Sequence, residues 1–180
     1  MNTATEFLTG ENPYENRVQR TLAFVDLSGF TRYTDSEGDE AAVKLLTDFR
    51  MRVREIAARR GVRIAKWLGD GAMLVSVEPE PITEAIVDME EAFDHAPLIL
   101  RAGIDSGPVI LFEGDDYIGK AVNMAARLCA AAKPGEVLGT KAMVSSLMVN
   151  TNVTPIGAHH IEGFAEPVEL VRLDSGNPDT

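Results

Sequence analysis

The chain has 180 residues, 45% of them hydrophobic and 25% charged, which is typical of one globular domain with a single core. Its formal net charge of −11 argues against nucleic acid or an anionic membrane surface as a partner, because both would be repelled, and any anionic ligand would need local cations. No apolar run approaches the roughly 18 residues that a membrane span requires, and the N-terminus lacks a basic region followed by an apolar one.

The first predicted elements are a tail, a strand and a long helix. Residues 1–18 are polar and aperiodic and contain Gly10 and Pro13, so we expect a flexible N-terminal tail. Residues 20–26 read as a strand, and apolar residues then recur at spacings of three and four until Gly61, which indicates an amphipathic helix. These apolar residues are Ala42, Leu45, Leu46, Phe49, Val53 and Ile56.

A hairpin is predicted next. Residues 62–68 and 72–77 are two strands joined across Gly69-Asp70-Gly71, where Asp-Gly is a strong signal for a tight turn. Side chains alternate across a strand, so Trp67 and Lys66 are expected on opposite faces, with Trp67 in the core. Six arginines from Arg50 to Arg63 fall on several helical faces among acidic neighbours, which is typical of a solvated surface.

A second helix and two further strands follow. The helix is predicted over residues 82–93, after a Pro-Glu-Pro sequence suited to a helix start. Residues 98–104 and 108–112 are predicted as separate strands, because Asp105-Ser106-Gly107 between them resembles a turn.

The next predicted helix covers residues 121–132 and is closed by Pro134-Gly135. Asn123 and Arg127 are four residues apart and share one face. The opposite face, expected to pack on the sheet, comprises Val122, Ala125, Ala126 and Cys129. Because this single cysteine cannot form an internal disulfide, a reducing compartment is the simpler interpretation, and we expect a cytoplasmic protein unless the chain is a piece of a longer membrane protein.

The remaining elements complete a mixed fold. A short strand, a short helix from Lys141 and a closing hairpin over residues 159–173 with its turn at Gly163 are predicted, and residues 174–180 form a polar tail. The order predicts an α+β fold with a ferredoxin-like βαββαβ core, additional C-terminal strands and a short helix, and a mostly antiparallel sheet. The folded domain is expected to cover residues 19–173.

Two aspartates stand where chemistry is expected. Asp26 and Asp70 each end an apolar strand beside a glycine, Gly29 and Gly69, that lets the backbone approach a ligand closely. Two such carboxylates can hold hard divalent cations against a polyphosphate. Either aspartate alone is as typical of a turn or a helix cap as of a metal site, so the prediction depends on the pair.

Three segments in order give a family resemblance: Ala23–Thr31, Lys66–Gly71 and Gly119–Leu128. Together they resemble the catalytic domain of the class III nucleotide cyclases, and the resemblance runs from about Arg20 to Leu173. It implies two divalent cations, Mg²⁺ or Mn²⁺, held by Asp26 and Asp70 with Leu27 assigned to the same metal site.

The resemblance also implies how the substrate is held. The start of a short helix would bind the β- and γ-phosphates through its free amides. That segment comprises Leu27, Ser28, Gly29, Phe30 and Thr31. Lys66 and Asp116 match the purine-reading positions, Asn123 the position that orients the ribose, and Arg127 the position that stabilises charge on the α-phosphate.

The purine pair favours adenine over guanine. An ammonium donates to adenine N1 while a carboxylate accepts from its exocyclic amine, and guanine presents the reverse pattern. Guanine-using members of the family resemble one another in having a glutamate where this chain has Lys66. The expected activity is therefore conversion of ATP to 3′,5′-cyclic AMP and pyrophosphate, with a guanylate cyclase or a catalytically silent nucleotide-binding regulatory module as alternatives.

The resemblance further implies a site shared between two chains. One protomer would supply the metal-binding aspartates and the other Lys66, Asp116, Asn123 and Arg127, so a homodimer would form two equivalent sites. Only residues 109–115 separate Gly107-Pro108 from Asp116, where many family members carry a longer hairpin arm. We therefore expect a weak homodimer.

Overall fold

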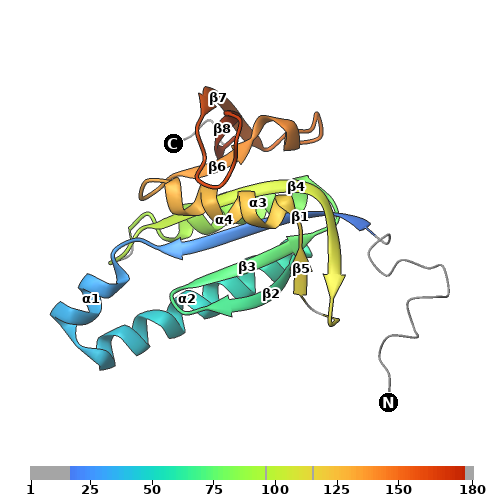
Figure 1. Cartoon of the computed structure of the whole chain (residues 1–180). Helices are drawn as coiled ribbons and strands as arrows, with labels where there is room; N and C mark the ends of the chain where they lie inside the picture. Colours follow the sequence, from blue (N-terminus) through green and yellow to red (C-terminus); the bar gives the residue numbers. More distant parts are fainter. Residues whose placement is uncertain (1–16, 96, 115, 177–180) are drawn as a thin grey trace, which may run out of the picture.

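The computed structural model describes residues 17–95, 97–114 and 116–176. They form an eight-stranded sheet with helices on both faces (Figure 1). The elements in chain order are β1 (Arg17–Leu27), α1 (Phe30–Glu37), α2 (Asp39–Arg60), β2 (Arg63–Leu68), β3 (Gly71–Ser76), α3 (Pro79–Ala92), β4 (Leu100–Phe112), β5 (Asp116–Ile118), α4 (Lys120–Ala131), β6 (Val137–Thr140), the 3₁₀ helix η2 (Lys141–Met143), β7 (Thr151–His159) and β8 (Val168–Ser175).

The sheet confirms the predicted fold class. Its strand order is β2-β3-β1-β4-β6-β8-β7, with β5 paired to β4. The first four of these strands, with α2 and α3 as crossovers, make the ferredoxin-like core, and β6, β8 and β7 extend the sheet beyond β4. Every pairing is antiparallel except that of β4 with β6.

Alternating residues of β1 separate two hydrophobic layers. Ala23, Val25 and Leu27 are buried against α2 and α3 in the main core. Leu22 points the other way and packs with Ala121 of α4. Since side chains alternate along a strand, Asp26 lies on the same face of the sheet as Leu22 and α4.

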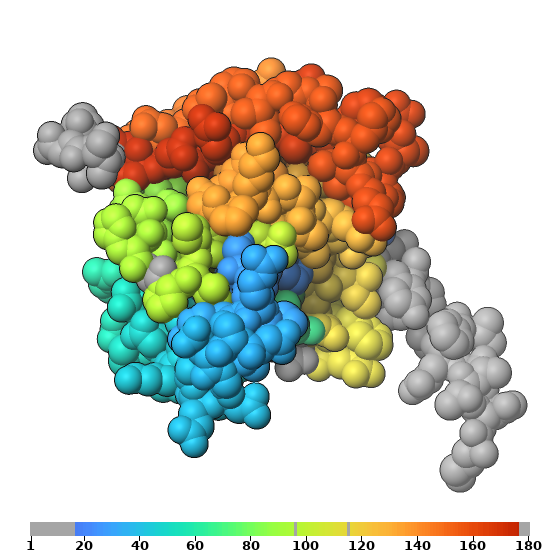
Figure 2. All heavy atoms as spheres, turned by 90° about the vertical axis from the view of Figure 1, so that its left-hand side faces the viewer, coloured from blue at the N-terminus to red at the C-terminus, as the bar shows by residue number. Residues whose placement is uncertain are grey.

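Glycines separate α1 from α2 and end α2. Gly38, with φ 86°, separates α1 from α2, and Gly61, with φ 66°, ends α2 in the left-handed conformation that favours glycine. α1 has no buried residue and stands out from this side of the molecule (Figure 2). Among the described residues, no helix is both long and apolar enough to cross a membrane.

Several predicted boundaries were wrong. β1 begins at Arg17, inside the predicted tail, because Arg17 and Val18 pair with β4; residues 1–16 and 177–180 lie outside the described residues. β4 is one continuous strand rather than two. Its pairing with β1 runs unbroken past Pro108, and on the other side of β4 the described strands pair only with residues 102–104 and 110–112, where no proline stands.

The C-terminal half also differs from the prediction. β5 was not predicted, since three residues carry too little pattern. The last hairpin starts at Thr151 rather than at residue 159, because β7 accommodates Pro155 and Gly157 at an irregularity in its pairing with β8. β7 is the last strand in the sheet order, where such residues are tolerated.

Candidate functional site

The backbone brings Asp26 and Asp70 together. Asp26 lies near the end of β1 and Asp70 in the turn between β2 and β3, and the Leu27 amide donates to the Asp70 carbonyl at 3.2 Å. Gly71 pairs with Asp26 across the strands. A Cβ at position 71 would stand 2.4 Å from the Val25 carbonyl oxygen, so only glycine allows β3 this close to β1.

The two carboxylates repel each other. Burial, followed by the negative charge of Asp26, raises the pKa of Asp70, and Arg101 partly offsets this effect. The Arg101 Nε and Nη2 atoms donate to Asp26 Oδ2 at 3.0 and 2.8 Å, while Nη1 donates to the Ala130 carbonyl at 3.1 Å. Arg101 was not identified from the sequence. The pairing of β4 with β1 places Arg101 directly opposite Asp26, so only a prediction of that strand register could have found it.

The acidic pair fits divalent cations. Asp26 and Asp70 supply hard oxygen ligands, and a cation between them would relieve their repulsion. The Ser28 hydroxyl is buried nearby with no hydrogen-bond partner among the described residues, while its amide donates to the Ile99 carbonyl at 2.9 Å. The described residues contain no group of three or more His, Cys, Asp or Glu side chains placed to hold a metal ion, so any further ligands must be hydroxyls, backbone, water or substrate oxygens.

The segment after Asp26 opens a helix without a side-chain cap. Gly29 adopts the left-handed conformation, with φ 84°, and α1 begins at Phe30. The Gly29 carbonyl accepts a hydrogen bond from the Tyr33 amide at 3.0 Å. The first amides of α1, including that of Thr31, therefore have no capping side chain, which is the arrangement that binds anions at helix starts.

Lys66 and Asp116 form an ion pair although 50 residues separate them. Lys66 lies in β2 and Asp116 opens β5, and both side chains are about half exposed. The Lys66 ammonium and the Asp116 carboxylate meet outside the core. Trp67, the next residue of β2, packs against the main core on the opposite side of the strand, as predicted.

Four of the six arginines assigned to a solvated surface interact within the fold instead. Arg52 lies over the Phe93 ring, and Arg60 forms ion pairs with Glu84 and Asp88 of α3. The guanidinium groups of Arg50 and Arg54 lie over the ring of Trp67, at 5.1 and 5.0 Å from its centroid. An indole ring attracts cations to its face, so these residues of α2 hold β2 from the side opposite Lys66.

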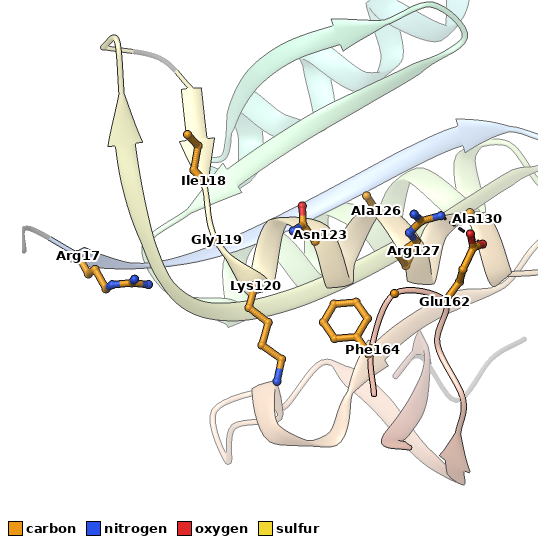
Figure 3. A pocket seen from close by; sticks show the side chains of 11 residues that line it. Arg17, Ile118, Gly119, Lys120, Asn123, Ala126, Arg127, Ala130, Glu162 and Phe164 are labelled. Carbon is orange, nitrogen blue, oxygen red and sulfur yellow. Dashed lines mark ion pairs between the residues drawn. The ribbon is translucent and has the colours of Figure 1, made fainter. Parts of the chain in front are cut away.

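A cavity of about 870 Å³ lies along α4 (Figure 3). Asn123 and Arg127 both line it and come from successive turns of one exposed helix face, as predicted. The Arg127 Nη1 atom forms an ion pair with Glu162 Oε2 at 3.2 Å, drawn as a dashed line in Figure 3. Glu162 comes from the loop between β7 and β8.

The buried face of α4 differs in part from the prediction. Ala125 and Cys129 are buried as expected, but Val122 and Ala126 are partly exposed. The buried residues are Ala121, Met124, Ala125, Leu128 and Cys129. Burial raises the pKa of the Cys129 thiol to about 12, so this cysteine is an inert core residue.

The described residues therefore hold three pairs of candidate residues at three places in the fold. Asp26 lies with Asp70, and Lys66 with Asp116. Asn123 and Arg127 line the α4 cavity, whose walls include none of the other four. Asp26 lies on the sheet face that carries α4, Lys66 pairs with Met73 of the same face, and Asn123 and Arg127 lie on α4 itself.

The sequence and the fold define the class of protein. The family described as "Adenylate and Guanylate cyclase catalytic domain" matches residues 13–173, and the chain belongs to this family. An uncharacterized protein of Mycobacterium tuberculosis is 37% identical over 157 residues, which are 84% of this chain and 40% of that protein. A pH-sensitive adenylate cyclase of the same species is 34% identical over 129 residues, 70% of this chain and 32% of that protein.

A solved structure agrees with these relatives. The adenylyl cyclase CyaB from P. aeruginosa superposes with a TM-score of 0.79 and 27% identity, covering 91% of this chain and 97% of that one. The chain spans between about a third and two fifths of the length of the two curated relatives. It is a nucleotide cyclase domain by family.

Proposed function

We propose that the chain is an adenylate cyclase domain that converts ATP to 3′,5′-cyclic AMP and pyrophosphate. The observation that carries this proposal is the meeting of two carboxylates, those of Asp26 and Asp70, at a partly buried turn. Repelling carboxylates held together by backbone are costly, and Arg101 offsets the repulsion only in part, so a bound divalent cation would stabilise the pair. Mg²⁺ or Mn²⁺ fits this set of oxygen ligands.

The ion pair of Lys66 with Asp116 supports adenine as the base. Its ammonium and carboxylate already lie side by side, so a purine edge would meet one donor and one acceptor together. Adenine offers the matching acceptor and donor, whereas guanine offers them reversed. A guanylate cyclase is the alternative that this pair disfavours.

The remaining residues have distinct tasks in the proposed reaction, in which the ribose 3′-oxygen attacks the α-phosphorus. Bound cations would lower the pKa of the 3′-hydroxyl and offset the phosphate charge. Asn123 orients the ribose, which lowers the barrier by positioning. Arg127 stabilises the charge that develops on the α-phosphate. The uncapped start of α1, at Ser28 to Thr31, holds the terminal phosphates.

We also propose that the active unit is a homodimer. Asp26 and Asp70 do not line the cavity beside Asn123 and Arg127, which supports a site completed by a second chain. The short hairpin of β4 and β5 carries exposed apolar side chains, Leu111, Phe112 and Ile118, which a partner chain would cover. A hairpin this short buries little area, so the dimer is expected to be weak.

Turnover assays test the activity. Purified protein with Mn²⁺ is expected to form cyclic AMP from ATP, with a lower kcat/KM for GTP. Cyclic GMP as the main product would favour the guanylate alternative. Binding of ATP without conversion at every protein concentration would favour a silent regulatory module. The presence of all six candidate residues argues against that alternative.

Complementation tests the shared site. Asp26→Ala and Arg127→Ala chains are each expected to be inactive, and mixing them rebuilds one of the two sites in the mixed dimer. Partial recovery of cyclic AMP formation supports a site built from two chains. A mixture as inactive as its components contradicts it.

A further inference from the structure

Among the described residues, Glu162 is the one acidic residue in the wall of the α4 cavity. The charged residues that line this cavity are otherwise basic: Arg17, Lys120 and Arg127. In a chain of net charge −11, three cations around one cavity form a local site for an anion. Glu162 reduces that positive charge at the position of Arg127, to which its carboxylate is paired at 3.2 Å.

The fold presents Glu162 to Arg127 on an anchored turn. Ile161 is buried beneath the turn against α4, and the Phe164 amide donates to the Ile161 carbonyl at 3.0 Å. Gly163 adopts φ 88°, which a side chain would oppose. Lys120 lies 5.8 Å from the Phe164 ring centroid, so both ends of the turn pack on the helix that carries Arg127.

Arg127 has no second ion pair or hydrogen bond from its side chain among the described residues. Its guanidinium is therefore bound to Glu162 alone within the described part of the chain. Phosphate oxygens and carboxylates seek the same planar donors. A nucleotide phosphate that approaches Arg127 thus competes with a carboxylate of this chain.

We propose that Glu162 sets the affinity of the site for nucleotide phosphate by occupying Arg127 until substrate displaces it. This inference rests on the proposed function of Arg127. The ion pair is easily displaced, because its side chains are 47% and 83% exposed. Removing the Glu162 charge is expected to tighten triphosphate binding about two- to five-fold, the range that exposed ion pairs support.

The test measures binding apart from turnover. The Kd of 3′-deoxy-ATP, which lacks the attacking hydroxyl, is measured by calorimetry with Mn²⁺ for the full chain and for Glu162→Gln. The expected Kd of the variant is two to five times lower, and the gain shrinks as salt rises because the charges are exposed. KM for ATP is expected to fall by a similar factor while kcat stays within two-fold.

Two controls isolate the ion pair. Glu166→Gln removes the same charge from an exposed residue of the same loop and is expected to leave the Kd within about 1.5-fold. In an Arg127→Ala background, Glu162→Gln is expected to give no gain, because the competition has already been removed.

The outcomes separate this inference from the proposed function. Equal affinities of wild type and Glu162→Gln overturn the inference alone if wild type forms cyclic AMP. A gain that persists without Arg127 overturns it too, since bulk charge then explains the effect. A fall in kcat for Glu162→Gln shows that Glu162 orients Arg127 instead. If the wild type binds no analogue, the proposed function fails and the inference with it.

Discussion

The acidic turn and the α4 cavity hold their charges in opposite ways. Asp26 and Asp70 are fixed by strand pairing, by a close approach that only Gly71 permits, and by two hydrogen bonds from Arg101. Arg127 has one exposed ion pair and otherwise extends from a helix surface. The first region is set by the backbone before any ligand arrives, whereas the second is held by one displaceable contact.

This difference follows from the sign of the charges. Two carboxylates separate unless rigid backbone holds them, so the acidic turn must be preorganised. A guanidinium that is to receive a phosphate has no such requirement, since substrate attracts it. The variants below test whether rigidity matters in the first region and charge alone in the second.

The largest effect is expected from Asp70→Asn. Loss of the carboxylate is expected to lower cyclic AMP formation at least about 1000-fold, because cation binding supplies several kcal/mol. The Tm of the cation-free protein is expected to rise, since the repulsion that raises the pKa of Asp70 is removed. Asp48→Asn, at a partly exposed position of α2 where the carboxylate pairs with Arg52, serves as the control in both assays. Near-normal turnover, or a falling Tm, would show that Asp70 is a structural residue.

Arg127→Ala is expected to lower kcat about 100-fold, which is the order of loss found when one donor to the transition state is deleted. The free energy of unfolding should change by less than about 0.5 kcal/mol, because the side chain is half exposed and its ion pair is weak. Turnover assays measure kcat, and urea denaturation measures the free energy of unfolding. Arg172→Ala, which removes an exposed arginine of β8, is the matched control. A large loss of stability with Arg127→Ala would erase the contrast between the regions.

Gly71→Ala tests the rigidity of the acidic turn without changing charge. The added Cβ meets the Val25 carbonyl oxygen at 2.4 Å, so the unfolding free energy is expected to fall by about 1–3 kcal/mol. Cyclic AMP formation is expected to fall as well, since Asp26 and Asp70 shift apart. At Gly107 a Cβ meets only a side-chain methyl, that of Ala121 at 3.2 Å, so Gly107→Ala should cost less. Equal losses at the two positions would speak against a special role of the turn.

The smallest effect concerns an acidic group outside the proposed site. Burial, with Asp94, Glu91 and Asp174 nearby, raises the pKa of Glu90 from 4.5 to about 7. The folded state therefore binds more protons than the unfolded state between these pH values, and stability falls as pH rises through about 7. From pH 5.5 to 8, wild type is expected to lose about 1 kcal/mol more than Glu90→Gln, a figure reduced for partial exposure. Urea denaturation at both pH values checks this; parallel losses would contradict it.

Periodic hydrophobic patterns that extend over many residues, and strong turn signals, made much of the fold predictable. The α2 residues Phe49, Val53 and Ile56 are all buried, and the Gly69-Asp70 turn joins β2 to β3 as the sequence indicates. Short or irregular elements were not predictable, because β5 has only three residues and β4 hides Pro108 inside a paired strand.

The sequence by itself determined the family and the six residues proposed to carry the chemistry, because their motifs are local and keep fixed spacing. It also placed Asn123 and Arg127 on one helix face, which follows from helix geometry alone. Only the tertiary structure revealed that Arg101 holds Asp26 and that Glu162 occupies Arg127. Those contacts join residues from different strands, helices and loops, and local spacing does not encode how such elements meet.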